Sequence, residues 1–523
     1  MYKKMLIIFV GIQLALACKQ TQTTTAEYKN VEVEEITILQ LQEGYKEGHY
    51  SIEQVVQTYL DRIKEIDQSG PHLNSFLYVN PKALETARAL DKEYKAGKSR
   101  GLMHGIPVVL KDNIDTHDMP TTAGSRALEN SYPLQDSWIA ERLRASGAII
   151  LGKANLSEWA NFRGENSTSG WSGLGGLSKN PYILDRNTCG SSAGSGVAAS
   201  ANLCVVAIGT ETNGSIVCPA HTNGVVGIKP TVGLISRAGI IPISWTQDTG
   251  GPMARSVSDA AVCLGVLTGI DNRDAKTQES NDKFQKNYTP FLKTDGLKGK
   301  KIGLFVGAMG YDAGVDSLCA IAVEKMKELG AEVIEIEEIA DPSTGGKSFK
   351  VMLYEYKDGL NKYFESLGDK AKIKNLEELI AFNKQDDVEL QYFDQVYLER
   401  AQAMGDLDSE AYKTILASML EQSRAGGMDR VMDKHELDAI IAPTGAPAWK
   451  TDLENGDSYI GGSSSPAAWS GYPSITVPMG FIEDLPVGIS IFGRAYDEGG
   501  LISIAYSYEQ ATLHRKAPRY LER

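Results

Sequence analysis

Segments in which apolar residues recur at helical spacing alternate along the chain with short, mainly apolar runs, and this predicts a succession of helices and strands. Ser51 and Gln54 have the spacing of a helix capping box, and apolar positions then recur on one helical face, namely Ile52, Val55, Val56, Tyr59, Ile63 and Ile66. A second helix is expected after Pro81 and should end near Gly97. Short uninterrupted apolar runs instead predict buried strands at residues 107–110, 148–151, 205–208, 301–306, 332–336, 439–442 and 475–477.

Further helices are predicted between these runs, at residues 137–143, 197–203, 256–270, 315–329 and 501–513. Asp136 is the expected cap of the first of them. Residues 342–437 are mostly helical in pattern, charged and aromatic, and we expect a helical insertion there on the substrate side. The repeated switch between these two patterns, together with 52 glycines, predicts the α/β class rather than all-α or all-β.

Composition narrows the possible partners. The chain has 523 residues, of which 42% are hydrophobic, so it can bury a large core. Its net charge is −14 and it has no basic run, which argues against binding nucleic acid because phosphates require a basic face. The sequence contains no fixed-period repeat and does not indicate an oligomeric state.

The first 17 residues have the pattern of an export signal. Lys3 and Lys4 form a basic head, an apolar run follows that is too short to span a bilayer, and small residues precede Cys18. This pattern resembles a bacterial lipoprotein signal. It implies cleavage before Cys18, acylation of that thiol, and a location in the cell envelope, on the periplasmic or surface side. An ordinary secretory signal is the alternative. Residues 18–30 are polar and are expected to form a tether.

The cysteines and histidines predict neither a disulfide framework nor a metal site. Five cysteines remain after Cys18, and an odd number with no zinc spacing favours buried thiols that act as small hydrophobes; they are Cys189, Cys204, Cys218, Cys263 and Cys319. No two of the seven histidines have the spacing of metal ligands. We therefore expect no metal.

Three polar positions could carry chemistry. Lys111 ends a predicted buried strand, at the edge where α/β proteins usually place functional groups, although a lysine there is more often solvated. Ser191 and Ser215 each lie in a glycine-rich segment, CGSSAGSG and ETNGSIV. Unpaired backbone N–H groups in such a turn suit an anion or an oxyanion, but a plain tight turn has the same composition. Residues 155–176, rich in Gly, Ser, Asn and Trp, suit a loop that lines a polar pocket or one that faces solvent.

Several segments together resemble the amidase signature family. The likeness rests on GIPVVLKDN around Lys111, on CGSSAGSG around Ser191 and on GTETNGSIVCPAHTNGVVGIKPT around Ser215, and it continues in LGKANLSEWANFRG, LISRAGIIPISWTQDTGGPMARSVSDAA, SGYPSITVPMGF and LPVGISIFGRAYDE. Ser215 follows Ser191 by 24 positions, as in that family. NLSEWANFRG and GTET carry a narrower likeness to bacterial peptide amidases, which remove the C-terminal amide of peptides.

The resemblance covers most of residues 50–515 and implies the family's fold. This is one large domain, over residues 31–523, with a central mixed, twisted β-sheet flanked by helices. It also implies a serine amidohydrolase that cleaves a carboxamide C–N bond through an acyl-enzyme, without cofactor or metal. The implied substrates are C-terminal peptide amides or small amides.

The resemblance also assigns roles to individual residues. Ser215 would be the nucleophile, Ser191 the proton relay and Lys111 the terminal base, which must be neutral and which burial can make so by lowering its pKa. A cis peptide bond is implied between Gly190 and Ser191. The backbone N–H groups from position 212 to Ser215 would bind the oxyanion.

That oxyanion site would comprise Thr212, Asn213 and Gly214, and Ala160 would lie near the bound acyl group. The chain departs from the common family pattern at three positions. Asn213 replaces a glycine, Val217 replaces an arginine, and Cys189 replaces a glycine. Asn tolerates positive φ better than most residues, so the oxyanion site can form while substrate choice differs.

Three other functions fit parts of the sequence. Ser192 in GSSAG matches the G-x-S-x-G nucleophile elbow of α/β-hydrolases, although residues 183–189 before it are too polar for the buried strand that the elbow requires. A lipid-anchored protein that binds amides or peptides without turnover is a second alternative. The amidase-like subunit of a tRNA-dependent amidotransferase is a third, against which the export signal argues.

Overall fold

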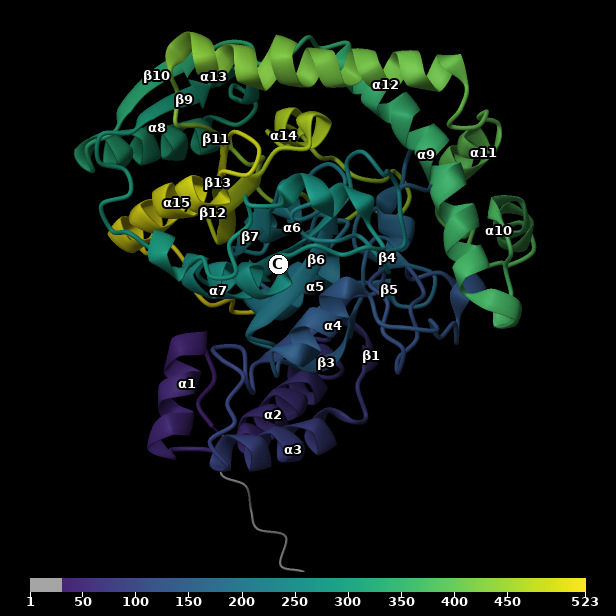
Figure 1. Ribbon diagram of the computed structural model, residues 1–523, viewed down its shortest axis with the longest axis vertical. Coiled ribbons are helices and arrows are strands. Elements are labelled where there is room, and N and C mark those ends of the chain that lie inside the picture. The colour runs from purple at the N-terminus through teal and green to yellow at the C-terminus, as the bar shows by residue number, and fades with distance from the viewer. Residues whose placement is uncertain (1–30) are drawn as a thin grey trace, which may run out of the picture.

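A computed structural model describes residues 31–523 (Figure 1). The predicted signal, the tether and Cys18 lie outside these described residues. None of the helices in residues 31–523 is both long enough and apolar enough to cross a bilayer.

The centre of the molecule is a mixed sheet of eleven strands, as the fold prediction requires. Their order across the sheet is β1-β3-β2-β6-β8-β7-β12-β13-β11-β9-β10. The strands are β1 (Phe76–Val79), β2 (Pro107–Lys111), β3 (Ile149–Ala154), β6 (Val206–Glu211), β7 (Val226–Lys229), β8 (Thr249–Ala254), β9 (Lys301–Phe305), β10 (Glu332–Ile336), β11 (Ala439–Pro443), β12 (Ser474–Ile482) and β13 (Leu485–Phe492). A separate hairpin pairs β4 (Trp171–Ser172) with β5 (Gly176–Leu177). The predicted α/β class with a mixed sheet is therefore confirmed.

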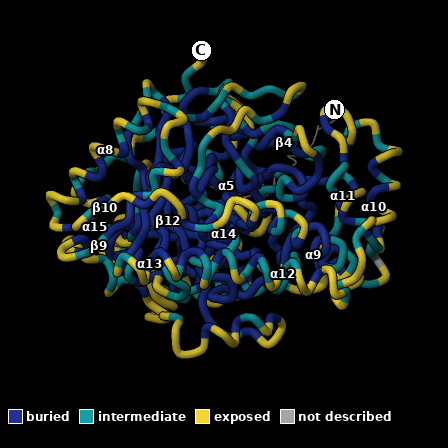
Figure 2. Tube along the Cα trace, turned by 90° about the horizontal axis from the view of Figure 1, so that it is seen from above, coloured by how far each residue is buried: buried dark blue, intermediate teal, exposed yellow. Residues whose placement is uncertain are grey.

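Helices flank this sheet along its whole length. They are α1 (Ile38–Glu47), α2 (Ile52–Arg62), α3 (Ala83–Lys95), α4 (Trp138–Ala145), α5 (Ala193–Ser200), α6 (Val217–Thr222), α7 (Val257–Leu267), α8 (Ala313–Glu328), α9 (Thr344–Ser366), α10 (Leu376–Asn383), α11 (Val396–Gln402), α12 (Glu410–Ser423), α13 (Asp429–His435), α14 (Ser465–Ser470) and α15 (Glu498–Thr512). Figure 1 shows α1–α3 at one end of the molecule and α12 and α13 across the other. Figure 2 shows that buried backbone fills the middle and that exposed positions lie at the rim.

Most predicted elements are present, with local corrections. The capping box of Ser51 and Gln54 is formed. The cap of α4 is Ser137 and not Asp136, whose carboxylate instead accepts hydrogen bonds from His117. The pattern missed β1, β7, β8 and β13 and the two-residue strands β4 and β5. In β7, β8 and β13, glycines or prolines interrupt the apolar runs on which strand prediction relies, whereas β1 is an apolar run of only four residues.

Parallel pairing of β2 with β6 positions the chemistry. Val108 pairs with Val206 and Leu110 pairs with Ile208, so both strands end at the same edge of the sheet. All five residues of β2 and all six of β6 are buried; the apolar runs predicted this for residues 107–110 and 206–208, but not for Lys111, Thr210 and Glu211 at the strand ends. The segment after β6 therefore lies beside Lys111, the last residue of β2.

Residues 342–437 contain α9–α13, and their apolar side chains pack on the loop after β3. Leu353, Tyr356 and Phe364 of α9 share a buried cluster with Trp159 and Phe162 of that loop. The loop is thereby fixed between the sheet and these helices.

Candidate active site

Lys111 is fully buried and contacts one of the two candidate serines. Its Nζ lies 2.7 Å from Ser191 Oγ, 2.9 Å from Thr210 Oγ1 and 3.3 Å from the Thr210 carbonyl oxygen. It makes no ion pair within residues 31–523. Burial lowers its pKa to about 7, although the more distant carboxylates of Asp248 and Glu211 act in the opposite direction. The lysine can therefore lose its proton near neutral pH.

Ser191 is fixed through its backbone as well as its hydroxyl. The cis peptide bond expected between Gly190 and Ser191 is present. The Ser191 carbonyl oxygen accepts a hydrogen bond from Ser157 N–H (3.1 Å), and the next residue, Ser192, donates its N–H to the Ser215 carbonyl oxygen (3.2 Å). The segment that carries Ser191 is thus joined directly to the segment that carries Ser215.

The Ser192 hydroxyl is hydrogen-bonded to the backbone of β6. It donates to the Thr210 carbonyl oxygen (3.1 Å) and accepts from Thr210 N–H (3.2 Å). Residues 184–189 contain no strand, so the nucleophile elbow lacks the element that would define it. The α/β-hydrolase alternative, with Ser192 as nucleophile, is not supported.

The turn from Thr212 to Ser215 is held at both ends. The Glu211 carboxylate accepts hydrogen bonds from the N–H groups of Ile216 (2.8 Å) and Val217 (3.1 Å). Thr212 Oγ1 donates to Asp248 (2.6 Å), whose pKa burial raises to about 6. These bonds fix the backbone without using the turn's own N–H groups.

The turn from Thr212 to Ser215 carries polar groups without a partner in residues 31–523. Within the described part of the chain, the N–H groups of Asn213, Gly214 and Ser215 donate to no acceptor, and the Ser215 hydroxyl has no hydrogen-bond partner. Gly214 has φ +83°, a conformation that favours glycine. Ser215 is 9% exposed, whereas Ser191 and Lys111 are 0% exposed. Ser215 is therefore the most exposed of the three residues.

The Asn213 side chain ties the turn to α14. Its Oδ1 accepts from Ser464 Oγ (2.7 Å) and its Nδ2 donates to Ser465 Oγ (3.3 Å). A Cβ atom at Gly214 would lie 3.1 Å from Ser464 Oγ, so this serine covers the turn closely. The asparagine that departs from the common family pattern thus has a contact of its own.

Ala160 lies in a loop of unusual backbone. Trp159, Ala160 and Asn161 have φ of 51°, 54° and 67°. A buried ion cluster holds this loop, in which Arg163 pairs with Glu158 at 2.6 Å and lies 3.6 Å from Glu389.

Glu389 comes from the segment between α10 and α11, and it also accepts hydrogen bonds from Ser125 Oγ (3.0 Å) and Arg126 N–H (2.6 Å). Burial and the neighbouring Glu389 raise the pKa of Glu158 well above its usual range. Sequence reasoning missed the ion cluster, because Glu389 is more than 200 positions from its partners.

The expectation of five buried thiols is wrong for one pair. Cys189 and Cys218 form a disulfide, whereas Cys204, Cys263 and Cys319 are free and buried as predicted. Cysteine parity could not reveal this pair, because three unpaired thiols accompany it. The available signal was position, since Cys189 lies two residues before Ser191 and Cys218 lies three residues after Ser215.

One group of side chains in residues 31–523 has the proximity of metal ligands. It consists of His117, Asp118 and Asp136, with His117 exposed. Arg144 pairs with both carboxylates, at 2.6 Å and 2.9 Å, so a cation of the protein already occupies this group. The histidine spacing did not indicate this group, because its other members are carboxylates.

One edge of the mixed eleven-stranded sheet thus carries a buried lysine, two serines and a turn whose backbone N–H groups are unpaired. The sequence profile of the amidase family matches residues 54–502, so the chain belongs to this family. It is an amide-hydrolysing enzyme.

Known proteins resemble this chain over nearly its whole length. The native peptide amidase of Stenotrophomonas maltophilia is 44% identical with a TM-score of 0.90, over 94% of this chain and 99% of that one. A peptide amidase solved with the competitive inhibitor chymostatin is 45% identical with a TM-score of 0.91, over 93% and 99% of the two chains. A probable amidase of Arabidopsis thaliana is 38% identical, over 94% of this chain and 92% of that protein.

Arg163→Met tests whether the buried ion cluster holds the loop of Ala160. The change leaves Glu158 and Glu389 buried without their cation, so we expect the free energy of unfolding to fall by about 3–5 kcal/mol. Urea denaturation followed by circular dichroism measures this. Arg400→Met is the matched control, because the Arg400 ion pair with Glu165 is exposed and contributes about 0–1 kcal/mol. Equal effects of the two changes would contradict the account.

Proposed function

We propose that this amidase hydrolyses the terminal carboxamide of amidated peptides, with Ser215 as nucleophile, Ser191 as proton relay and Lys111 as base. The observation that carries the proposal is the 2.7 Å contact between a buried, ion-pair-free Lys111 and Ser191. A lysine whose pKa is about 7 is neutral in a large fraction of molecules near pH 7, and the neutral amine can accept a proton from a hydroxyl group.

In the first half-reaction the Ser215 oxygen attacks the carbonyl carbon of the substrate. As the C–O bond forms, the Ser215 proton passes to Ser191 Oγ while the Ser191 proton passes to Lys111 Nζ. The tetrahedral intermediate then collapses, the C–N bond breaks, and the proton returns along the same path to the leaving nitrogen. Ammonia departs and an acyl ester on Ser215 remains.

In the second half-reaction water replaces ammonia. Lys111, again neutral, accepts through Ser191 a proton from the water that attacks the ester. Collapse of the second intermediate breaks the ester bond and returns the proton to Ser215. The sum is one amide and one water converted into one carboxylic acid and one ammonia, without cofactor or metal.

The turn from Thr212 to Ser215 stabilises both intermediates. Negative charge develops on the carbonyl oxygen in each transition state, and preorganised N–H groups there contribute about 3–4 kcal/mol per donor. The unpaired N–H groups of Asn213, Gly214 and Ser215 support this role for them, and Thr212 orients the turn through Asp248. Ala160 is proposed to lie against the acyl group.

Peptide amides are the proposed substrates because the two peptide amidases share 44–45% of their residues with this chain. Ammonia release from an amidated dipeptide, from the same dipeptide as free acid, and from a small aliphatic amide separates the substrate classes. The proposal expects release from the amidated dipeptide, with a higher kcat/KM than for the small amide. Tight binding of the amidated dipeptide without ammonia release would favour the non-catalytic binding protein instead.

We also propose that the enzyme is exported and lipid-anchored at Cys18. The sequence pattern of residues 1–18 motivates this, and the Cys189–Cys218 disulfide supports it because disulfides persist in oxidising compartments. Metabolic labelling with an alkyne fatty acid should mark the wild type and leave Cys18→Ala unlabelled. Equal labelling of the two, or labelling of neither, would refute the anchor.

Substitutions at the three serines separate their roles. Ser215→Ala should lower kcat by about 10⁴-fold or more and abolish labelling by a fluorophosphonate, because the attacking oxygen is gone. Ser191→Ala should lower kcat by a comparable factor while KM changes little, because only proton transfer is lost. Ser192→Ala is the control and should retain most activity. Labelled Ser215→Ala protein, or a Ser192→Ala variant without activity, would contradict the assignment.

The pH dependence of the rate should report the Lys111 base. Because its pKa is about 7, the amine is protonated and inactive below that value and neutral above it. We expect kcat/KM to rise roughly tenfold per pH unit below pH 7 and to level off above it. Asp248→Asn removes a charge that raises the Lys111 pKa, so it should move the inflection to lower pH. A rate that is flat or falls with rising pH would exclude a neutral lysine as base.

A further inference from the structure

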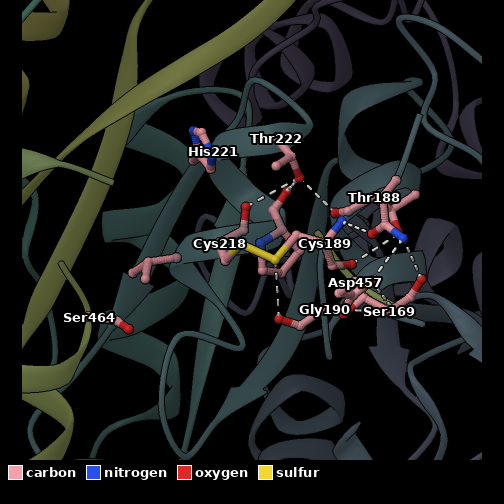
Figure 3. Close-up of a disulfide and its surroundings, with 12 residues drawn as sticks. Ser169, Thr188, Cys189, Gly190, Cys218, His221, Thr222, Asp457 and Ser464 are labelled. Carbon is pink, nitrogen blue, oxygen red and sulfur yellow. Dashed lines mark hydrogen bonds between the residues drawn. A yellow bond between two sulfur atoms is a disulfide. The ribbon is translucent and has the colours of Figure 1, made fainter. Parts of the chain in front are cut away.

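The Cys189–Cys218 disulfide joins the two segments that carry the serines. Its Cα atoms are 5.9 Å apart and it links residues 29 positions apart in sequence. Cys189 begins the run Cys189–Gly190–Ser191, and Cys218 lies in the first turn of α6, directly after Ser215. Figure 3 shows the bond bridging these two segments beside Thr188, Thr222 and Asp457. The crosslink is therefore a covalent connection between the relay and the nucleophile.

Hydrogen bonds also hold the two segments together, at other points. Thr222 Oγ1 and Asn223 Nδ2 donate to the Thr188 carbonyl oxygen, at 2.7 Å and 3.0 Å. Cys189 N–H itself donates to Asn187 Oδ1 at 2.7 Å. These bonds hold the residues that precede Cys189, whereas Ser191 follows it. The fold consequently has contacts that keep the segments adjacent when the disulfide is absent.

Cysteine at position 189 is unfavourable for the backbone. Its φ is +51°, in the left-handed region that favours glycine. Both half-cystines are buried, with 6% and 4% exposure, so neither side chain is available for contacts at the protein surface. A side chain kept at such a position requires a compensating interaction, and the crosslink to Cys218 is that interaction.

The nucleophile depends on its backbone for its position. Within the described residues no hydrogen bond holds the Ser215 hydroxyl. The hydrogen bond from Ser192 N–H to the Ser215 carbonyl oxygen measures 3.2 Å, which is longer than the two bonds to the Thr188 carbonyl oxygen. Proton transfer through Ser191 requires hydroxyl oxygens within hydrogen-bond reach, and a misplacement of about 1 Å costs about 10²-fold in rate.

We propose that the Cys189–Cys218 disulfide is a positioning crosslink: it fixes the backbone segment of Ser191 relative to that of Ser215, so that a proton can pass between the two hydroxyl groups. This inference rests on the proposed function. Within residues 31–523 neither sulfur forms a hydrogen bond with Lys111, Ser191 or Ser215, so we assign the two cysteines as positioning residues. Loss of the bond lowers the rate of acylation and leaves substrate affinity in place.

The test compares three forms of the full-length enzyme. One is the double variant Cys189→Ala/Cys218→Ala, one is Cys189→Gly/Cys218→Ala, and one is wild type treated with a water-soluble phosphine. In the last form the phosphine is oxidised to its oxide, with oxygen from water, and two electrons and two protons convert the disulfide into two thiols. Mass spectrometry of alkylated peptides confirms which bond was reduced.

All three forms should acylate 10- to 100-fold more slowly than untreated wild type. The rate is measured with a fluorophosphonate and, for an amidated dipeptide, as kcat, with KM within about twofold of wild type. Assays are run well below the thermal midpoint of each form. The phosphine should not slow the double variants further, and Cys319→Ala is the matched control, because it removes a buried thiol from α8 and should keep wild-type rates.

Each of the other possible outcomes contradicts either this inference or the proposed amidase mechanism on which it rests. Wild-type acylation rates in the reduced enzyme and in both double variants would show that the crosslink does not position the serines. A normal rate in the glycine variant alone would assign the effect to the backbone of residue 189. A rise in KM with unchanged kcat would make the bond part of substrate binding. Wild type that neither reacts with the fluorophosphonate nor releases ammonia would instead refute the proposed function.

Discussion

Burial of one lysine without a carboxylate partner is the constraint on which the site depends. Transfer of an ammonium group out of water is unfavourable, and the usual remedy is an ion pair. Lys111 has none among the described residues and donates only to Ser191 and Thr210, so loss of its proton relieves the penalty. The sheet enforces this, because β2 is buried at every residue and ends at Lys111. The chemistry of the site is therefore a consequence of strand burial.

The other polar groups around the site hold the turn from Thr212 to Ser215 in position without restoring an ion pair to Lys111. Glu211 and Asp248 are both buried carboxylates, yet each is occupied by the turn, through Ile216, Val217 and Thr212. Their charges act on the lysine only from a distance. The same two side chains thus hold the turn from Thr212 to Ser215 and raise the pKa of Lys111 against the effect of burial.

Much of the fold and of the site could be predicted from local sequence. Apolar runs located β2 and β6 and the capping box located α2, because burial and capping are local demands on residue type. The cis peptide at Gly190–Ser191 and the grouping of Lys111 with Ser191 came from family resemblance, which the geometry matches. Contacts between separate segments could not be derived from hydrophobic periodicity or capping. The Asn213 bonds to Ser464 and Ser465, the Arg163 ion cluster and the Cys189–Cys218 bond each depend on tertiary packing of segments far apart in the chain.

Direct titration of Lys111 tests the central claim. Nitrogen-15 and carbon-13 labelling of the lysines allows side-chain resonances to be followed by NMR between pH 5 and pH 11, and Lys111→Met and Lys229→Met variants assign the resonances of these two buried amines among the three buried lysines of the described residues. The account predicts a resonance that is absent from Lys111→Met and titrates with a pKa of about 7, separate from that of Lys229, whose burial lowers its pKa to about 8. A Lys111 resonance that titrates near the ordinary lysine value of about 10.4 would contradict the account.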